Sequence, residues 1–396
     1  MDNIIFVGSV YPDKLYDELL RLNAHIDFAA HTFQSALLAG LDEYTTVRVI
    51  SSPVIRMERR VKKGFDSYYF SHLGAGEEKD VYVGTKNGIL LKVYEFFQVR
   101  KFLKKYIEEY HDASILVYAL HSPFLLALCT LKNIRGKACV VVPDLPEHMS
   151  DNKSLMYKLA KKIDKCLIDF CLKRIEGFVL FSPYMKNLLP IGKKPWIQVE
   201  GIYRANPKAS NIEKAGCKTV LYTGGIDSRY GVFDLIEAFT LIEQEDYELW
   251  LCGGCSEKRK LEHYLASDPR IKYFGMVDKN KVSDLQRQAS LLVNPRHSTE
   301  EFTKYSFPSK TMEYLASGTP TLMCKLPAMP DEYLPYVYLF KDESVNGYKQ
   351  SIIEVLSKPK DELIQKGEKA SNFILSQKNE KIQSKKIINL LNVIKK

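Results

Sequence analysis

The segment RHSTEEFTKYSFPSKTMEYLASGTP, from Arg296 to Pro320, contains in one stretch the pattern that decides the fold. An apolar run at Leu291–Asn294 predicts a strand that ends just before it. A polar loop follows, and the spacing of apolar residues then predicts a helix over Ser309–Ala316, with Ser309 as the N-cap. Gly318 and Pro320 end this helix. The segment is therefore a strand, a loop and a helix in succession.

The same strand-and-helix unit recurs along the whole chain, which predicts an α/β fold with parallel sheets. The strands predicted in the first half are Ile4–Val7, Thr46–Ser51, Ser114–Ala119, Ala138–Val142 and Gly177–Phe181. Those predicted in the second half are Thr219–Thr223, Glu248–Cys252, Ile271–Phe274, Leu291–Asn294 and Thr321–Cys324. In the second half most of these strands end in glycine, as phosphate-binding turns of doubly wound sheets do.

A chain of 396 residues is long enough for two domains. Pro195–Lys218 interrupts the alternation and is interpreted as the linker. We expect an N-terminal Rossmann-like domain at residues 1–200 and a C-terminal one at 201–374. The polar segment Asp361–Lys396 is predicted to be helical, and its end, from about residue 375, is expected to pack back on the first domain.

Composition favours a cytoplasmic protein: the chain is 45% hydrophobic and 27% charged, and no long apolar stretch predicts a spanning helix. The start of the chain does not resemble a secretory signal. The eight cysteines are scattered, as in reduced proteins. Cys252 and Cys255 have CxxC spacing but no second pair, so no metal site is expected. The net charge of +9 permits an anionic partner.

The start of the predicted helix at Ser309 has the properties of an anion site. Free backbone N–H groups and the positive end of the helix dipole lie there. Glu313 falls one turn further on, where its carboxylate could accept hydrogen bonds from two neighbouring hydroxyls, such as those of a ribose. This geometry suits a nucleotide-sugar, although the same helix could simply carry an ordinary surface glutamate.

This segment resembles the donor-site motif of the family-4 retaining glycosyltransferases, in the version found in bacterial capsular and exopolysaccharide biosynthesis. Glu313 matches the second glutamate of the family's pair, and Ala316-Ser-Gly-Thr-Pro320 matches the turn that follows. The first glutamate corresponds to Tyr305, where this chain departs from the pattern. Glu300 and Glu301 are the nearest carboxylates upstream. The resemblance implies the GT-B fold, with two Rossmann-like domains facing a cleft.

The resemblance also implies which residues bind the donor. Thr223-Gly-Gly-Ile-Asp-Ser-Arg-Tyr-Gly231 is similar to the family's diphosphate loop, and Arg229 is the cation nominated there because a guanidinium can hold two phosphate oxygens. Phe274-Gly-Met-Val277 is similar to the segment whose backbone reads the base. The donor-binding set is Gly224, Gly225, Arg229, Gly253, Met276, Val277, Arg296, Tyr305, Ser306, Phe307, Lys310 and Glu313.

In the first half, Tyr118-Ala-Leu-His121 resembles a strand end of the same family, and His121 and Asp144 are expected to orient the acceptor or the sugar. Together with Arg229 they form the predicted catalytic set. Glu147 and His148 follow Asp144 and are also available. The competing interpretation of His121 is a buried histidine whose hydrogen bonds are satisfied within the protein. Asp144 could equally serve to form a turn.

The resemblance implies a retaining hexosyltransferase that takes a sugar from a nucleotide-diphosphate donor, expected to be UDP-linked, and gives it to a saccharide acceptor, expected to be lipid-linked. The nucleotide-sugar is a co-substrate, and no cofactor, metal or nucleic-acid partner is expected. Two alternatives stay open: a UDP-sugar 2-epimerase of the same fold, which needs no acceptor, and a non-catalytic partner subunit, which the tyrosine at position 305 favours.

Two basic segments raise the possibility of peripheral contact with an anionic membrane. Lys153–Arg174 has seven Lys and Arg residues against two Asp. Its apolar residues recur at helical spacing: Leu155, Leu159, Ile163, Leu167 and Phe170. The second basic segment is Arg56–Lys63. Such patches can rest on anionic lipid, but the same spacing is typical of a helix whose apolar face packs on a protein core.

Overall fold

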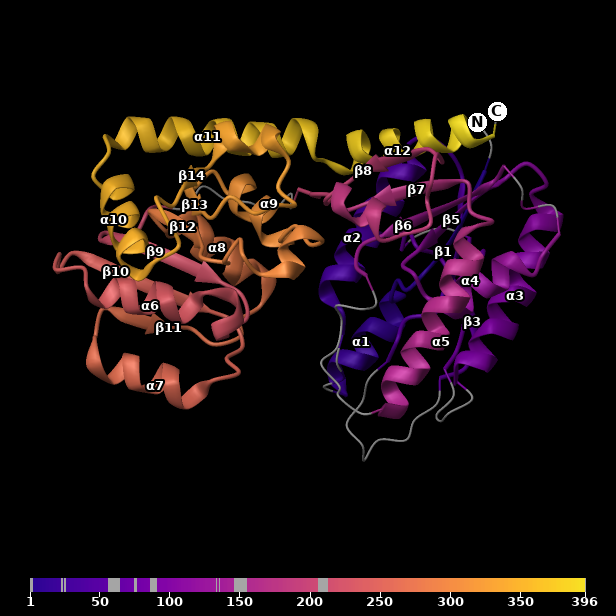
Figure 1. The fold of residues 1–396 in the computed structure, drawn as a ribbon, viewed down its shortest axis with the longest axis horizontal. Helices are drawn as coiled ribbons and strands as arrows, with labels where there is room; N and C mark the ends of the chain where they lie inside the picture. Colours follow the sequence, from indigo (N-terminus) through magenta and orange to yellow (C-terminus); the bar gives the residue numbers. More distant parts are fainter. Residues whose placement is uncertain are drawn as a thin grey trace. The chain divides into compact units, whose positions relative to one another are not determined.

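The computed structural model describes residues 3–22, 24, 26–55, 65–74, 77–85, 91–132, 134, 136–145, 155–205 and 213–395. The chain forms two compact units (Figure 1). Unit 1 consists of Met1–Arg204 together with Glu380–Lys396, and unit 2 of Ala205–Asn379.

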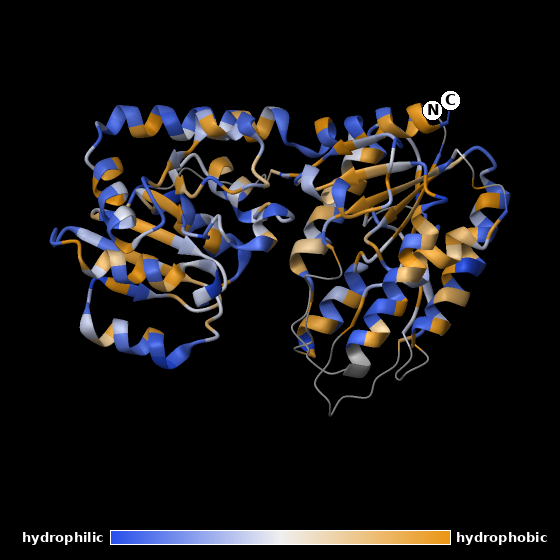
Figure 2. Cartoon of the chain, in the orientation of Figure 1, coloured by the Kyte–Doolittle hydropathy of each residue, from blue (hydrophilic) through white to orange (hydrophobic). Residues whose placement is uncertain are grey.

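The sheet of unit 1 has the strand order β3-β4-β2-β1-β5-β6-β7-β8, and every neighbouring pair is parallel except β3 with β4. The strands are β1 (Ile4–Gly8), β2 (Val47–Ser51), β3 (Tyr68–Phe70), β4 (Asp80–Tyr82), β5 (Ser114–Tyr118), β6 (Ala138–Val142), β7 (Gly177–Leu180) and β8 (Trp196–Gln198). The central strands are buried along their full length. This explains why they are continuous apolar runs in the sequence (Figure 2).

The helices of unit 1 are α1 (Asp13–Arg21), α2 (Phe28–Asp42), α3 (Leu91–Glu109), α4 (Ser122–Cys129), α5 (Leu155–Leu172), the 3-10 helix η2 (Pro183–Asn187) and α12 (Glu380–Ile394). The last helix packs against α2. A Cβ added to Gly40 of α2 would collide with the carbonyl oxygen of Glu380, and Ser384 Oγ donates a hydrogen bond to the carbonyl of Leu37 at 3.2 Å. None of the described helices is long and apolar enough to cross a membrane.

Unit 2 is a doubly wound sheet with the order β11-β10-β9-β12-β13-β14, in which all neighbouring strands are parallel. Its strands are β9 (Lys218–Thr223), β10 (Tyr247–Cys252), β11 (Ile271–Tyr273), β12 (Leu291–Asn294), β13 (Thr321–Met323) and β14 (Tyr338–Leu339). Successive strands are added on one side of β9 as far as β11, and on its other side from β12 to β14, so the strand order reverses between β9 and β12. Ligands of such sheets bind outside the carboxyl ends of the strands at this switch point.

The helices of unit 2 connect these strands. They are α6 (Val232–Thr240), α7 (Lys258–Ser267), α8 (Lys279–Gln288), α9 (Ser309–Ala316), α10 (Val345–Leu356) and α11 (Lys360–Gln377), with the 3-10 helices η3 (Ser228–Tyr230), η4 (Glu301–Lys304) and η5 (Asp331–Tyr336). The predicted bounds of α9 agree with the structure at both ends. The α/β, doubly wound architecture predicted for the chain is confirmed.

Three details of local structure differ from the prediction. The segment interpreted as a linker, Pro195–Lys218, contains the boundary between the two units, after Arg204, but it also contains β8, which pairs with β7 at the edge of the first sheet. The N-cap of α9 is Pro308 rather than Ser309, because Ser309 already has helical backbone angles. The C-terminal polar segment is helical, as predicted, but it forms two helices, since α11 ends at Gln377 and α12 begins at Glu380.

Unit 1 contains a buried histidine between two aspartates. His72 Nδ1 lies 2.6 Å from Asp80 Oδ2, and its Nε2 lies 2.8 Å from Asp42 Oδ2. Only 6% of the His72 side chain is exposed. Burial lowers the pKa of His72, but the two carboxylates outweigh this effect and raise the pKa to about 9. The imidazolium therefore links α2 to the strand β4 at neutral pH.

Candidate functional site

The loops after β9 and β10 approach each other closely at the switch point of unit 2. Gly224 and Gly253 have φ values of +150° and +139°, and a Cβ on Gly253 would collide with the backbone of Gly224. Their N–H groups donate to the carbonyls of Cys252 at 2.7 Å and Gly275 at 2.8 Å. Both glycines therefore permit close backbone packing, and neither offers its N–H to a ligand.

Three basic side chains meet beside these loops. Lys310, from the first turn of α9, directs Nζ toward Gly224 and lies over the ring of Tyr222, 5.7 Å from its centroid. Arg296 follows β12, and its guanidinium lies 5.0 Å from the ring centroid of Tyr230. Arg229, from η3, lies 5.1 Å from the same ring centroid. The loop after β12, helix α9 and the loop after β9 thus each contribute a cation.

Lys310 and Arg296 are partly buried and poorly solvated, whereas Arg229 is exposed, and the positive charges repel one another. Burial lowers the pKa of Lys310 to about 8; Glu313 opposes this effect and Arg296 adds to it. Burial also lowers the pKa of Arg296, and the positive charge of Arg229 adds to this lowering. Within the described part of the chain, no carboxylate lies within ion-pair distance of Lys310, Arg296 or Arg229. Partly buried cations without a carboxylate partner, as Lys310 and Arg296 are, make this cluster a candidate site for an anion.

The first turn of α9 completes the site. Pro308 precedes it and offers no side-chain cap, so the helix begins without one. Tyr314, on the buried side of α9, accepts a hydrogen bond from the N–H of Thr223 at 2.7 Å through its hydroxyl. This bond ties α9 to the end of β9. Glu313 is half-buried beside Tyr314, and the described residues give its carboxylate no hydrogen-bond partner.

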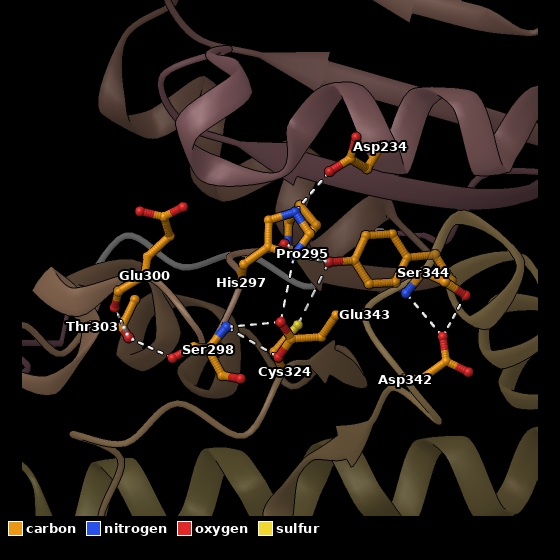
Figure 3. Close-up of polar contacts among 11 residues, drawn as sticks. Asp234, Pro295, His297, Ser298, Glu300, Thr303, Cys324, Asp342, Glu343 and Ser344 are labelled. Carbon is orange, nitrogen blue, oxygen red and sulfur yellow. Dashed lines mark hydrogen bonds and ion pairs between the residues drawn. The ribbon is translucent and has the colours of Figure 1, made fainter.

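A polar cluster holds the loop that carries Arg296 (Figure 3). His297 Nε2 lies 2.7 Å from Asp234 Oδ2 of α6. Glu343 accepts from the N–H of Ser298 at 3.0 Å through both carboxylate oxygens, and the hydroxyl of Tyr348 donates to the carbonyl of Pro295 at 2.8 Å. The residues on either side of Arg296 are thus fixed. Sequence reasoning missed this cluster because its members are up to about 110 positions apart and form no local pattern.

The other predicted donor residues lie in different environments. The ring of Phe307 is buried against Tyr333, with the ring centroids 5.0 Å apart, so its side chain packs in the interior of unit 2. Tyr305 and Ser306 are half-buried in the loop before α9. Met276 is 85% exposed, and Val277 packs against the interior of unit 2.

The remaining candidates are placed as follows. Gly225 follows Gly224. A Cβ added to Gly225 would meet only the ring of Tyr230, at 3.5 Å. Glu300 and Glu301 are exposed at the start of η4. Figure 3 shows the Glu300 carboxylate outside the drawn contacts, while its carbonyl accepts from Thr303.

In unit 1, His121 follows β5 and caps α4. Its Nε2 lies 2.8 Å from Glu95 Oε2 of α3, and Glu95 is buried. Ala119, two residues earlier, has φ +71°, the left-handed region that residues other than glycine avoid; within the described ranges it is the one such residue. Backbone strain of this kind is common beside ligand sites. The contact with a buried carboxylate also supports a purely structural role, so both interpretations of His121 stand.

Asp144 follows β6 and remains solvent-accessible, yet protein surrounds it closely. This desolvation, with a smaller effect of Asp27, raises the pKa of Asp144. Burial, with Asp144 and Asp27 adding to it, also raises the pKa of Tyr118. The carboxylates of Asp144 and Asp27 thus lie near enough to Tyr118, the last residue of β5, to act on its pKa. Glu147, His148 and the basic segment Arg56–Lys63 lie outside the described residues.

The CxxC pair is split between environments. Cys252 is buried, with its Sγ 3.6 Å from the carbonyl of Gly275, whereas Cys255 is partly exposed, and both are free thiols. Across the ranges that the structure describes, no three side chains among His, Cys, Asp and Glu are grouped so that they could hold a metal ion.

The family of Glycosyl transferases group 1 matches residues 217–358, which include every cation of the site in unit 2. A comparison with curated proteins found no match. Solved structures resemble the chain at 10–15% identity. Sucrose-phosphate synthase from Thermosynechococcus elongatus is 15% identical with a TM-score of 0.64, over 100% of this chain and 99% of that one.

Two further structures contain ligands. HepE from Anabaena, in complex with UDP, is 12% identical with a TM-score of 0.64, over 99% of this chain and 100% of that one. TarM from S. aureus, in complex with fondaparinux, α-GlcNAc-glycerol and UDP, is 14% identical with a TM-score of 0.56, over 79% of this chain and 61% of that one. At these identities the likeness concerns the fold. Residues 217–358 are therefore a glycosyl transferases group 1 domain in a chain of GT-B fold, and the protein is a glycosyltransferase.

Proposed function

We propose that the chain transfers a sugar, with retention of configuration, from a UDP-linked donor to a saccharide acceptor that is lipid-linked, in the synthesis of a surface polysaccharide. The observation that supports the donor half is the cluster of Lys310, Arg296 and Arg229 at the switch point of unit 2, where none of the described carboxylates lies within ion-pair distance of these cations. A diphosphate supplies the missing negative charge. The solved HepE structure, a similar protein, is a complex with UDP.

The same groups account for the chemistry. The bond from the anomeric carbon to the diphosphate breaks, and a bond to the acceptor oxygen forms on the same face. The acceptor proton passes to a diphosphate oxygen, so no protein nucleophile takes part. Arg229, Arg296 and Lys310 stabilise the charge that develops on the leaving diphosphate. Glu313 accepts hydrogen bonds from the ribose hydroxyls, and the loop at Tyr305 and Ser306 meets the sugar.

On the acceptor side, we propose that His121 and Asp144 orient the saccharide. Both follow strand ends of unit 1, and the positive φ of Ala119 beside His121 supports a constrained site there. The raised pKa of Asp144 makes its carboxyl group easier to protonate than an ordinary aspartate, so it could donate a hydrogen bond to an acceptor oxygen.

The test begins with nucleotide binding. UDP, GDP and ADP are compared by calorimetry, and transfer from the corresponding nucleotide-sugars is then followed with saccharide acceptors; the anomeric configuration of the product is read by NMR. Glu313→Ala and Arg229→Ala should each strongly reduce transfer while the protein stays folded. Lys369→Ala, an exposed lysine of α11, is the matched control. Near-normal turnover in both variants would contradict the site.

Two outcomes would favour the other functions. Conversion of UDP-N-acetylglucosamine to its 2-epimer without acceptor would identify an epimerase. A protein that binds no nucleoside diphosphate at millimolar concentration would be a partner subunit. An inverted product would overturn the retaining mechanism while leaving the donor site in place.

A further inference from the structure

Helix α5 exposes an apolar stripe along most of its length. Leu159, Ile163 and Phe170 are 60%, 56% and 53% exposed, and Leu167 is 38% exposed. At 3.6 residues per turn these four side chains fall within roughly 80° of the helix circumference. They form one continuous surface, which we call the α5 face. Single exposed apolar residues are ordinary on proteins, whereas a contiguous stripe marks a contact surface.

The α5 face is distinct from the side of α5 that packs on unit 1. The core side is formed by Ile168, Cys171 and Leu172, which are at most 3% exposed, and α4 packs beside α5 (Figure 1). The alternative drawn from the sequence, in which the recurring apolar residues are the core side of the helix, is therefore wrong for the four residues of the α5 face.

Lysines border this face on one side. Lys158 and Lys162, one turn apart, and Lys173 are exposed, and Asp169 is the acidic residue among them. The other acidic residue of the helix, Asp164, is neutralised: it pairs with Lys92 of α3 at 3.1 Å and accepts from the hydroxyl of Ser122 at 2.5 Å. An apolar stripe beside a basic flank complements an anionic lipid surface.

The α5 face lies beside the acceptor-side strand end. Ser122, which bonds to Asp164, directly follows His121 at the start of α4. Lys92 brings the first turns of α3 to the same place, where Val93 and Phe97 are 50% and 60% exposed. Exposed apolar side chains of α3 are thus linked, through the Lys92–Asp164 pair, to the helix that carries the α5 face.

We propose that the α5 face docks unit 1 on an anionic lipid surface, with Leu159, Ile163, Leu167 and Phe170 at the acyl boundary and the lysine flank on the headgroups. The inference deepens the proposed function, because it places His121 where a lipid-linked saccharide leaves the membrane. Its test does not depend on transfer activity.

Binding of the full chain to phosphatidylcholine vesicles, with and without phosphatidylglycerol, is measured by co-sedimentation. We expect binding to the anionic vesicles that weakens with salt. Leu159→Ser/Ile163→Ser/Phe170→Ser should weaken it by about tenfold or more, since each side chain loses its apolar burial. Lys158→Gln/Lys162→Gln should weaken it by about fivefold for each lysine. Ile364→Ser/Leu375→Ser, two exposed apolar residues of α11, is the matched control and should bind as the native chain does.

The proposal fails if the native chain binds neither kind of vesicle, or if the triple α5 variant and the α11 control bind alike. It also fails if light scattering shows that the native chain is a dimer and the triple variant a monomer, because a second copy then covers the α5 face in the native protein. UDP calorimetry of the triple variant should match that of the native protein. This result separates loss of docking from misfolding and from failure of the donor site.

Discussion

The substitution Lys310→Met tests the donor site through two opposite effects. Methionine keeps the length and the apolar stem of lysine but removes the charge. In the free protein, burial lowers the pKa of Lys310 to about 8, from an ordinary value of 10.5. The difference of 10.5 − 8 units corresponds to roughly 3 kcal/mol at most, and partial exposure reduces this to about 1–3 kcal/mol. We therefore expect the variant to be more stable than the native protein at pH 7.

The pH dependence has a definite sign. Because the pKa of Lys310 is lower in the folded than in the unfolded state, the charged lysine destabilises the fold below pH 8. This cost disappears as the pH rises from about 8 to 10.5. The free energy of unfolding of the native protein should therefore increase over this pH range relative to that of the Lys310→Met variant.

Nucleotide binding should respond in the opposite direction. A charge-assisted hydrogen bond is worth about 1.5–3 kcal/mol, so the variant should bind UDP roughly 10- to 150-fold more weakly. In the native protein the diphosphate holds Lys310 in its charged form. UDP affinity should therefore fall above pH 8, by up to about tenfold per pH unit, and binding near pH 8 should take up a proton.

Urea denaturation measures the stability, and calorimetry in two buffers of different ionisation enthalpy measures the affinity and the proton uptake. Lys369→Met controls for the loss of an exposed charge and should change neither quantity. A Lys310→Met protein that is less stable yet binds UDP normally would refute the reasoning, as would a native affinity that is flat across pH 8.

Two further predictions concern single side chains. The pKa of His72 is raised from 6.5 to about 9 in the folded protein, so its pairing with Asp42 and Asp80 should stabilise unit 1 fully below pH 6.5. The free energy of unfolding should then fall by roughly 2–3 kcal/mol as the pH rises from 7 to 10. Urea midpoints should show this loss, and His72→Asn should abolish it. Tyr314→Phe leaves the N–H of Thr223 without its acceptor, so we expect about 1–3 kcal/mol less stability and weaker UDP binding. Calorimetry at a temperature where the variant is fully folded checks the second effect, and an unchanged affinity would show that Tyr314 does not position α9.

The strands of this chain could be predicted because their physics is local. A strand buried on both faces of a parallel sheet is an apolar run, as at Ala138–Val142 and Leu291–Asn294. The bounds of α9 were equally visible, since Gly318 and Pro320 end the helix. The N-cap was not, because a proline with extended backbone can precede a helix without any capping side chain.

What the sequence could not reveal depends on distant contacts. Helical spacing shows that α5 has an apolar stripe, but not whether another element covers it, and here Ile168 and Leu172 face the core instead. The cluster around His297 unites residues from α6, from the loop after β12 and from the loop before α10. Its members are recognisable only once the sheet order has brought β9 and β12 together.

The unpaired cations are the strongest sign of function because they oppose stability. A fold selected for stability alone would pair Lys310 and Arg296 with carboxylates, or replace them with apolar residues, since an unpaired buried charge is costly. Places where local rules are broken without compensation inside the protein are expected to be functional or strained sites, and a bound anion would compensate these cations. Tyr305 carries no such signal, because a half-buried tyrosine in a loop breaks no rule. The physics of this chain therefore supports the proposed donor site, whereas the effect of Tyr305 on the transferred sugar has to be measured.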